Sequence, residues 1–171
     1  MTLLVLVLAA GCGSPSEPRD AGAAPASGAQ TTTGPPWPAP TQDVAARVAA
    51  AGLDLGPMGT AEHYHPMLRV VVEGEPVPVA PGIGVDPTTG AMSAVHTHEG
   101  DGTIHVESDA PGAVYTLGQL FTQWGVELGP DAVGGVRAPD GVRVLENGRV
   151  LDGDPAEVRL RPDQELVLEV S

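Results

Sequence analysis

Apolar and polar positions in the second half of the chain follow first the period of a helix and then that of strands. The stretch "TLGQLFTQWGV" has apolar residues at helical spacing, which predicts a core-facing helix through Leu117, Leu120, Phe121 and Trp124. The stretch "VRVLENGRVLDGDPAEVRLRPDQELVLEVS" predicts a strand, a turn at Asn147-Gly148, a second strand, a loop and a closing strand.

Two further predictions come from the first half. "TQDVAARVAAAG" predicts a short helix with Thr41 as its N-cap and Gly52 as its stop. "HPMLRVVVEGEPVPVA" predicts two strands around Glu73-Gly74. Pro76 and Pro78 lack a backbone donor, so we expect the second strand at a sheet edge.

This order of strands, one amphipathic helix and more strands predicts an α+β domain, in which a helix packs across a small mixed β-sheet. The last thirty residues resemble the end of β-grasp domains such as the small sulfur-carrier proteins, which implies a β-grasp-like C-terminal part. Those carriers act through a terminal Gly-Gly, whereas this chain ends in Glu169-Val170-Ser171, so the resemblance does not imply sulfur carriage. We predict a single domain over residues 42–171.

The chain begins "MTLLVLVLAAGC", an apolar run too short to cross a bilayer as a mature helix and typical of a cleaved export signal. Its end resembles the lipobox of bacterial lipoproteins. That resemblance implies a signal peptide over residues 1–11, cleavage before Cys12, and a lipid on the Cys12 thiol. The alternative is an unmodified Cys12 in an ordinary signal peptide. No Lys or Arg precedes the run, which leaves open a start upstream of Met1.

Residues 12–41 are rich in Gly, Ala, Pro, Ser and Thr, a composition that cannot bury enough apolar surface to offset ordering. We predict a flexible linker that holds the domain off a cell membrane, on its periplasmic or extracellular side. Trp37 is the one aromatic residue of this segment. We expect it to be exposed to solvent, with docking on the domain as the alternative.

Charge and cysteine content limit which classes of binding partner and which metal ligands are expected. The chain has 22 Asp and Glu against 8 Lys and Arg, a formal net charge of -14. Such a field disfavours nucleic acid and favours cations. Cys12 is the only cysteine, so a lipidated chain has no free thiol, and a metal site must use His and carboxylate ligands.

All five histidines fall in "EHYHP" and "AVHTHEGDGTIHVES". If Asp101-Gly102 forms a two-residue hairpin turn, His98 lies opposite His105 and His96 lies opposite Glu107 on one sheet face. His63 and His65 alternate in the same way on another strand. The predicted metal ligands are His63, His65, His96, His98, His105 and Glu107, with Glu99 and Asp101 as residues that orient them. A three-residue loop would instead place His105 opposite Thr97 and divide the cluster. The remaining alternative is that the histidines are scattered polar residues on a solvent-exposed sheet face.

The same stretches resemble a family of exported or membrane-anchored proteins of bacteria and archaea. Its recurring pattern is His-x-His-Pro, His-Thr-His-Asp, Gly-x-Ile-His-x-Glu-Ser and Leu-Gly-x-x-Phe-x-x-Trp-Gly. This chain carries the pattern over residues 62–125, with Glu99 where the family has Asp. The resemblance supports a histidine site and implies no activity.

Imidazole and carboxylate ligands suit copper or zinc. Soft ligands are available in Met58, Met67 and Met92, although packing is the commoner role of methionine. We predict a lipid-anchored protein that binds copper or zinc for metal handling or sensing, with a metal-transfer protein as a possible partner. The alternatives are a zinc enzyme with an activated water and a structural metal that supports a protein-interaction surface. We favour binding over catalysis and assign no catalytic residue.

Overall fold

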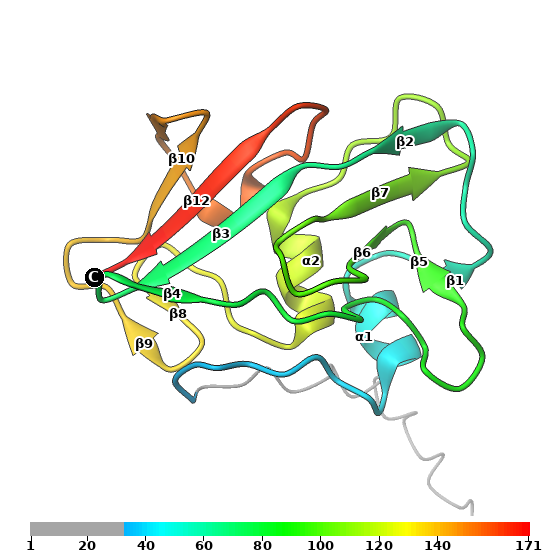
Figure 1. The fold of residues 1–171 in the computed structure, drawn as a ribbon, viewed down its shortest axis with the longest axis horizontal. Coiled ribbons are helices and arrows are strands. Elements are labelled where there is room, and N and C mark those ends of the chain that lie inside the picture. Colours follow the sequence, from blue (N-terminus) through cyan, green and yellow to red (C-terminus); the bar gives the residue numbers. More distant parts are fainter. Residues whose placement is uncertain (1–32) are drawn as a thin grey trace, which may run out of the picture.

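A computed structural model describes residues 33–171, so the predicted signal peptide and Cys12 lie outside the described residues. The elements, shown in Figure 1, are α1 (Val44–Ala50), β1 (Leu55–Gly56), β2 (Glu62–Tyr64), β3 (Met67–Val72), β4 (Glu75–Val77), β5 (Met92–Ser93), β6 (Val95–His96), β7 (His105–Ser108), α2 (Leu117–Trp124), β8 (Ala132–Val133), β9 (Val136–Arg137), β10 (Arg143–Glu146), β11 (Arg149–Leu151), the 3-10 turn η1 (Pro155–Glu157) and β12 (Glu165–Val170). Neither described helix is long and apolar enough to span a membrane.

The main sheet has five strands in the order β11-β10-β12-β3-β4. Strands β3 and β12 run parallel at its centre, and the β3-β4 and β10-β11 hairpins are antiparallel. Two hairpins around a central parallel pair, with a helix packed across them, is the arrangement of a β-grasp sheet. The predicted α+β class is confirmed. The proline-bearing strand β4 lies at the edge, as its sequence predicts.

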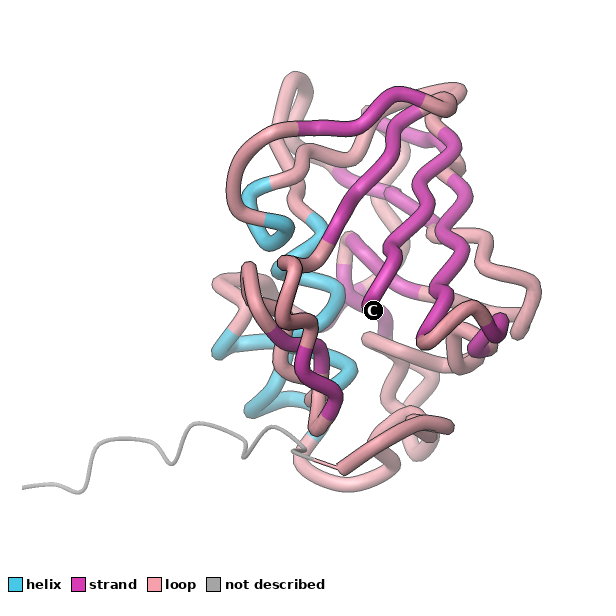
Figure 2. The backbone as a smooth tube through the Cα atoms, turned by 90° about the vertical axis from the view of Figure 1, so that its left-hand side faces the viewer, coloured by secondary structure: helices cyan, strands magenta, loops and turns pink. Residues whose placement is uncertain are grey.

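Alternation along the two central strands builds the core. Leu68 and Val70 on β3 are paired with Leu166 and Leu168 on β12, and all four side chains are buried. Because successive strand residues point to opposite faces, this register lines one face with apolar side chains. Figure 2 shows both helices on the same side of the long strands.

Helix α2 covers that face. It buries the four residues that its spacing predicts: Leu117, Leu120, Phe121 and Trp124. At its start Thr116 and Gln119 form a capping box, and at its end Gly125 has a φ of 74°. The predicted helix and its core-facing residues are therefore confirmed.

Helix α1 differs from the prediction at its start. Its N-cap is Asp43, with a φ of 56° and no side-chain cap hydrogen bond, so the prediction of Thr41 is wrong. Gly52 follows the helix with a φ of 72°, and its N–H donates to the Ala49 carbonyl. The predicted stop is confirmed, because a glycine adopts this conformation at no steric cost.

A second sheet of three strands has the order β2-β7-β6. Strand β2 runs through Pro66 directly into β3, so the segment 62–72 contributes to both sheets (Figure 1). The Pro66 carbonyl accepts a hydrogen bond of 2.9 Å from the Ile104 N–H. The small sheet is thereby fixed to the large one.

Trp37 belongs to the core and is not exposed to solvent, so that expectation is wrong. Its side chain is 2% exposed and meets Trp124 edge to face at a ring distance of 6.0 Å. The Trp124 indole N–H donates to the Trp37 carbonyl at 2.9 Å. Burying an indole offsets the ordering of the surrounding Pro and Ala residues. The ordered part of the chain thus extends before residue 42 and into the predicted linker.

Candidate metal centre

The three-stranded sheet gathers the histidines on one face. His63 is paired with Glu107 across β2 and β7, and His96 is paired with His105 across β6 and β7. Because directly opposed residues share a face and His105 and Glu107 are two apart, all four side chains lie on the same side. The opposite face carries Val95 and Val106, which are fully buried in the core.

The predicted hairpin register is wrong by two positions. His96, and not His98, lies opposite His105, and the connection spans residues 97–104. Asp101-Gly102 is not the turn. Gly102 packs against β3, and its carbonyl accepts a hydrogen bond of 2.8 Å from the Leu68 N–H. A Cβ atom at Gly102 would collide with the Leu68 carbonyl. A shift by two positions keeps every side chain on its face, so the predicted gathering survives the error.

Three histidines form what we call the inner group: His96, His98 and His105. One ring nitrogen of each lies within 4.8 Å of the others. The Nε2 atoms of His96 and His98 are 3.1 Å apart. The Nε2 atom of His105 is buried and has no hydrogen-bond partner among the described residues. A buried ring nitrogen without a partner is costly unless a ligand occupies the space in front of it.

Backbone contacts fix the His96 ring. Its Nδ1 lies 2.8 Å from the Ser93 carbonyl oxygen, and a carbonyl only accepts. The proton is therefore on Nδ1, and the Nε2 lone pair faces His98. This is how metal-binding histidines are usually oriented. Ser93 has no signal in the sequence, because it acts through its backbone.

Thr97 holds the two neighbouring histidines in place. It is fully buried between them, donates from its hydroxyl to the Ala80 carbonyl at 2.8 Å, and accepts from the Ile83 N–H at 3.0 Å. Gln123 of α2 donates to the Val95 carbonyl at 3.1 Å and secures the same strand. Sequence reasoning missed both residues. The signal at Thr97 was a polar residue on the core-facing side of the strand.

A second set, the outer group, consists of His63, His65 and Glu107, whose ligand atoms also lie within 4.8 Å of one another. The Nε2 atoms of His63 and His65 are 3.2 Å apart, and His63 Nε2 is 3.4 Å from Glu107 Oε1. The two imidazoles are exposed, whereas the Glu107 side chain is only 8% exposed.

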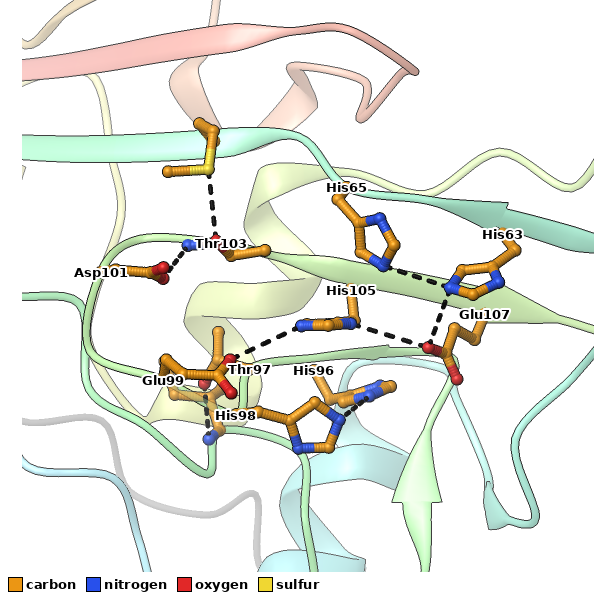
Figure 3. A network of polar contacts seen from close by, with 12 residues as sticks. His63, His65, His96, Thr97, His98, Glu99, Asp101, Thr103, His105 and Glu107 are labelled. Atoms are coloured by element: carbon orange, nitrogen blue, oxygen red, sulfur yellow. Dashed lines mark hydrogen bonds and ion pairs between the residues drawn. The ribbon is translucent and has the colours of Figure 1, made fainter.

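Glu107 contacts both groups. The oxygen Oε1 that faces His63 is also 3.6 Å from His105 Nδ1. Figure 3 shows the His105 ring between the His96–His98 pair and the His63–His65 pair. With Nδ1 directed to Glu107, Nε2 is the His105 nitrogen available to an ion. A carboxylate behind a histidine in this way fixes the ring and raises its basicity as a ligand.

Burial keeps the imidazoles of His96 and His105 neutral. Desolvation lowers the pKa of His96 to about 4, against the raising effect of the Ser93 hydrogen bond. Desolvation, with the neighbouring His98 and His65, also lowers the pKa of His105. A neutral imidazole is the form that coordinates a metal, so ligation at neutral pH requires no deprotonation of these two rings.

The remaining predicted residues lie at the margin of the cluster. Glu99 is 65% exposed, and its Oε2 is 3.8 Å from His105 Nε2, within reach of an ion in the inner group. Asp101 accepts from the Thr103 N–H at 2.9 Å, a contact that lowers its pKa and closes the loop. The Met67 sulfur accepts from the Thr103 hydroxyl.

Comparison with known proteins finds no matching family model, no matching curated protein and no matching solved structure. Three ligand atoms lie close together in each of the two groups, and in the inner group the His96 ring is also held from behind by the Ser93 carbonyl.

Proposed function

We propose that this protein is an extracytoplasmic lipoprotein that binds copper or zinc through its histidine cluster and takes part in metal handling or sensing outside the cytoplasm. The observation that carries the proposal is the inner group. Its three ring nitrogens lie within 4.8 Å of one another, and one of them is buried without a hydrogen-bond partner. A cation bound to all three would supply the missing partner.

The ligand chemistry supports copper or zinc. Imidazole and carboxylate ligands bind Zn(II) and Cu(II) well, and the chain has no thiolate beyond Cys12 to favour a cysteine-ligated site. The formal net charge of -14 also attracts cations. Hard ions such as Ca²⁺ prefer shells of six or more oxygen ligands, which this imidazole-rich set does not provide.

Metal content tests the proposal directly. The full chain with Cys12→Ser, purified without a histidine tag, is expected to hold zinc or copper after reconstitution. The His96→Ala, His98→Ala variant is expected to lose the inner ion. Arg137→Ala is a matched control, because Arg137 is 80% exposed and forms its ion pair with the exposed Asp131. Absence of any bound metal in the parent chain would overturn the proposal.

Membrane attachment is a separate part of the proposal and rests on the lipobox-like sequence before Cys12. Labelled fatty acid is expected to be incorporated into the unaltered chain and not into Cys12→Ser, with the protein moving from the membrane to the soluble fraction. Equal labelling of both chains would contradict lipid attachment at Cys12. Metal binding by the purified chain is unaffected by either result.

One observation favours a second candidate, a zinc enzyme. The inner group supplies three histidines, and three protein ligands with an open fourth position are typical of catalytic zinc. Glu99 lies beside that position and is exposed, so it is the candidate general base. Hydrolysis of an activated ester by the zinc-loaded chain, abolished in Glu99→Gln with zinc retained, would favour catalysis over metal handling.

A further inference from the structure

We propose that the cluster is a centre for two ions, with a slowly exchanging inner site and a rapidly exchanging outer site that share Glu107. This inference rests on the proposed metal binding and deepens it. It assigns the outer group to the exchange of ions with solvent or a partner, and the inner group to retention.

Two complete ligand sets support two ions. The inner set is His96, His98 and His105, the outer set is His63, His65 and Glu107, and they have no residue in common. Within each set the closest pair of histidines comes from one His-x-His unit, with Nε2 atoms 3.1 Å and 3.2 Å apart. A single ion cannot bind all five imidazoles in a tetrahedral shell, so one ion would leave part of the cluster unused.

The surroundings of the two sets differ. The inner set includes His96, which is fully buried, and His105, which is 17% exposed, beside the exposed His98. Both rings are held from behind, by Ser93 and by Glu107. In the outer set His63 is 59% exposed and His65 is also exposed. Ligands on exposed side chains reorganise easily, so we expect the outer ion to leave first.

Glu107 couples the sites. The same oxygen, Oε1, is 3.4 Å from His63 Nε2 and 3.6 Å from His105 Nδ1. It is a ligand for the outer ion and a positioning residue for the inner one, since its carboxylate faces His105 Nδ1. Its negative charge, at a side chain only 8% exposed, also reduces the repulsion between two nearby cations.

Stoichiometry and exchange rate test the two-site arrangement. Co(II) is the probe, because its visible absorption reports the geometry of each site, and a chelator added in excess reports release. The Cys12→Ser chain is expected to bind two ions and release them in a fast and a slow phase. His63→Ala, His65→Ala is expected to keep one slow ion, and His96→Ala, His98→Ala one fast ion.

Each outcome decides a different claim. One ion in the parent chain, lost in both double variants, would mean a single shared site and would overturn this inference while leaving metal binding intact. Two ions that leave in one phase would overturn the assignment of inner and outer roles. No ion at all would overturn the proposed function itself.

The shared role of Glu107 is tested by a pair of substitutions. In Glu107→Gln an amide oxygen still faces His105 Nδ1 but is a poor metal ligand, so the fast ion is expected to disappear and the slow ion to stay. In Glu107→Ala the slow ion is expected to bind about 10–100-fold more weakly as well. Two ions in Glu107→Gln, or unchanged inner affinity in Glu107→Ala, would overturn the coupling.

Discussion

In both the five-stranded and the three-stranded sheet, strand register brings residues of one kind together. The residues are apolar in the first sheet and are histidines in the second. Across β3 and β12, Leu68 is opposite Leu166 and Val70 is opposite Leu168, so register places apolar against apolar and fills the core. Across β6 and β7, His96 is opposite His105, so register places imidazole beside imidazole. The first arrangement packs the core, and the second gathers candidate metal ligands on one face.

The largest effect is expected in the five-stranded sheet. Leu168 is fully buried on the central strand β12. Leu168→Ala is expected to lower the free energy of unfolding by about 2–5 kcal/mol, because it removes apolar contacts and leaves a cavity. Urea unfolding measures this. The metal content of the folded fraction is expected to stay at the parent value, and a loss of metal in folded protein would break the proposed division between the sheets.

The next largest effect is expected where the two sheets meet. Gly102 has a φ of 93° and packs against the Leu68 carbonyl. Gly102→Ala is expected to cost about 2–3 kcal/mol, because the added methyl group is strained in this conformation and collides with β3. Gly74→Ala is a useful control, since Gly74 has a positive φ with open space around it. Equal losses in the two variants would mean that the contact with β3 is unimportant.

A smaller effect is expected at Thr97. Thr97→Val leaves the Ala80 carbonyl and the Ile83 N–H without their partner, which is expected to cost about 1–2 kcal/mol. Because Thr97 separates His96 from His98, metal affinity is expected to fall too. Thr97→Ser retains the hydroxyl and serves as the matched control. Thermal unfolding and a metal titration, run side by side, report the two losses.

The smallest effect on the metal-free protein is expected at His98, which is exposed. His98→Ala is expected to change the free energy of unfolding by less than about 0.5 kcal/mol without metal. Zinc at one hundred times its Kd is expected to stabilise the parent chain by about 2.7 kcal/mol and the variant much less. Equal stabilisation by zinc in both would remove His98 from the ligands.

Local signals in the sequence predicted most elements of the five-stranded sheet. Glu73-Gly74 and Asn147-Gly148 both adopt positive φ values and form the hairpin turns expected of them. Asp101-Gly102 carries the same kind of signal but does not form a hairpin turn. Gly102 instead allows the loop to approach β3 closely. A dipeptide cannot distinguish a tight turn from a distant backbone contact, so the turn was mistaken while the face of each histidine was not.

The prediction that Trp37 is exposed to solvent was wrong for a related reason. Its neighbours have the composition of a linker, and the partner that buries it, Trp124, is 87 residues away. Ser93 and Gln123 were missed because each acts through a contact to backbone that no spacing rule encodes. The structure does bring the predicted ligands together, because alternation assigns them to one face once β2 and β7 are neighbours.

The parallel pairing of β3 with β12 determines when this protein can assemble. Strand β3 continues from β2, which carries His63, and its central partner β12 comes nearly a hundred residues later. While the chain is being synthesised, β3 has β4 and residues 102–103 beside it, and its long central partner is missing until residues 165–170 are available. Such long-range pairing is slow to form. The support beneath the histidines is therefore completed late, so a nascent chain holds its candidate ligands in a looser arrangement than the finished protein.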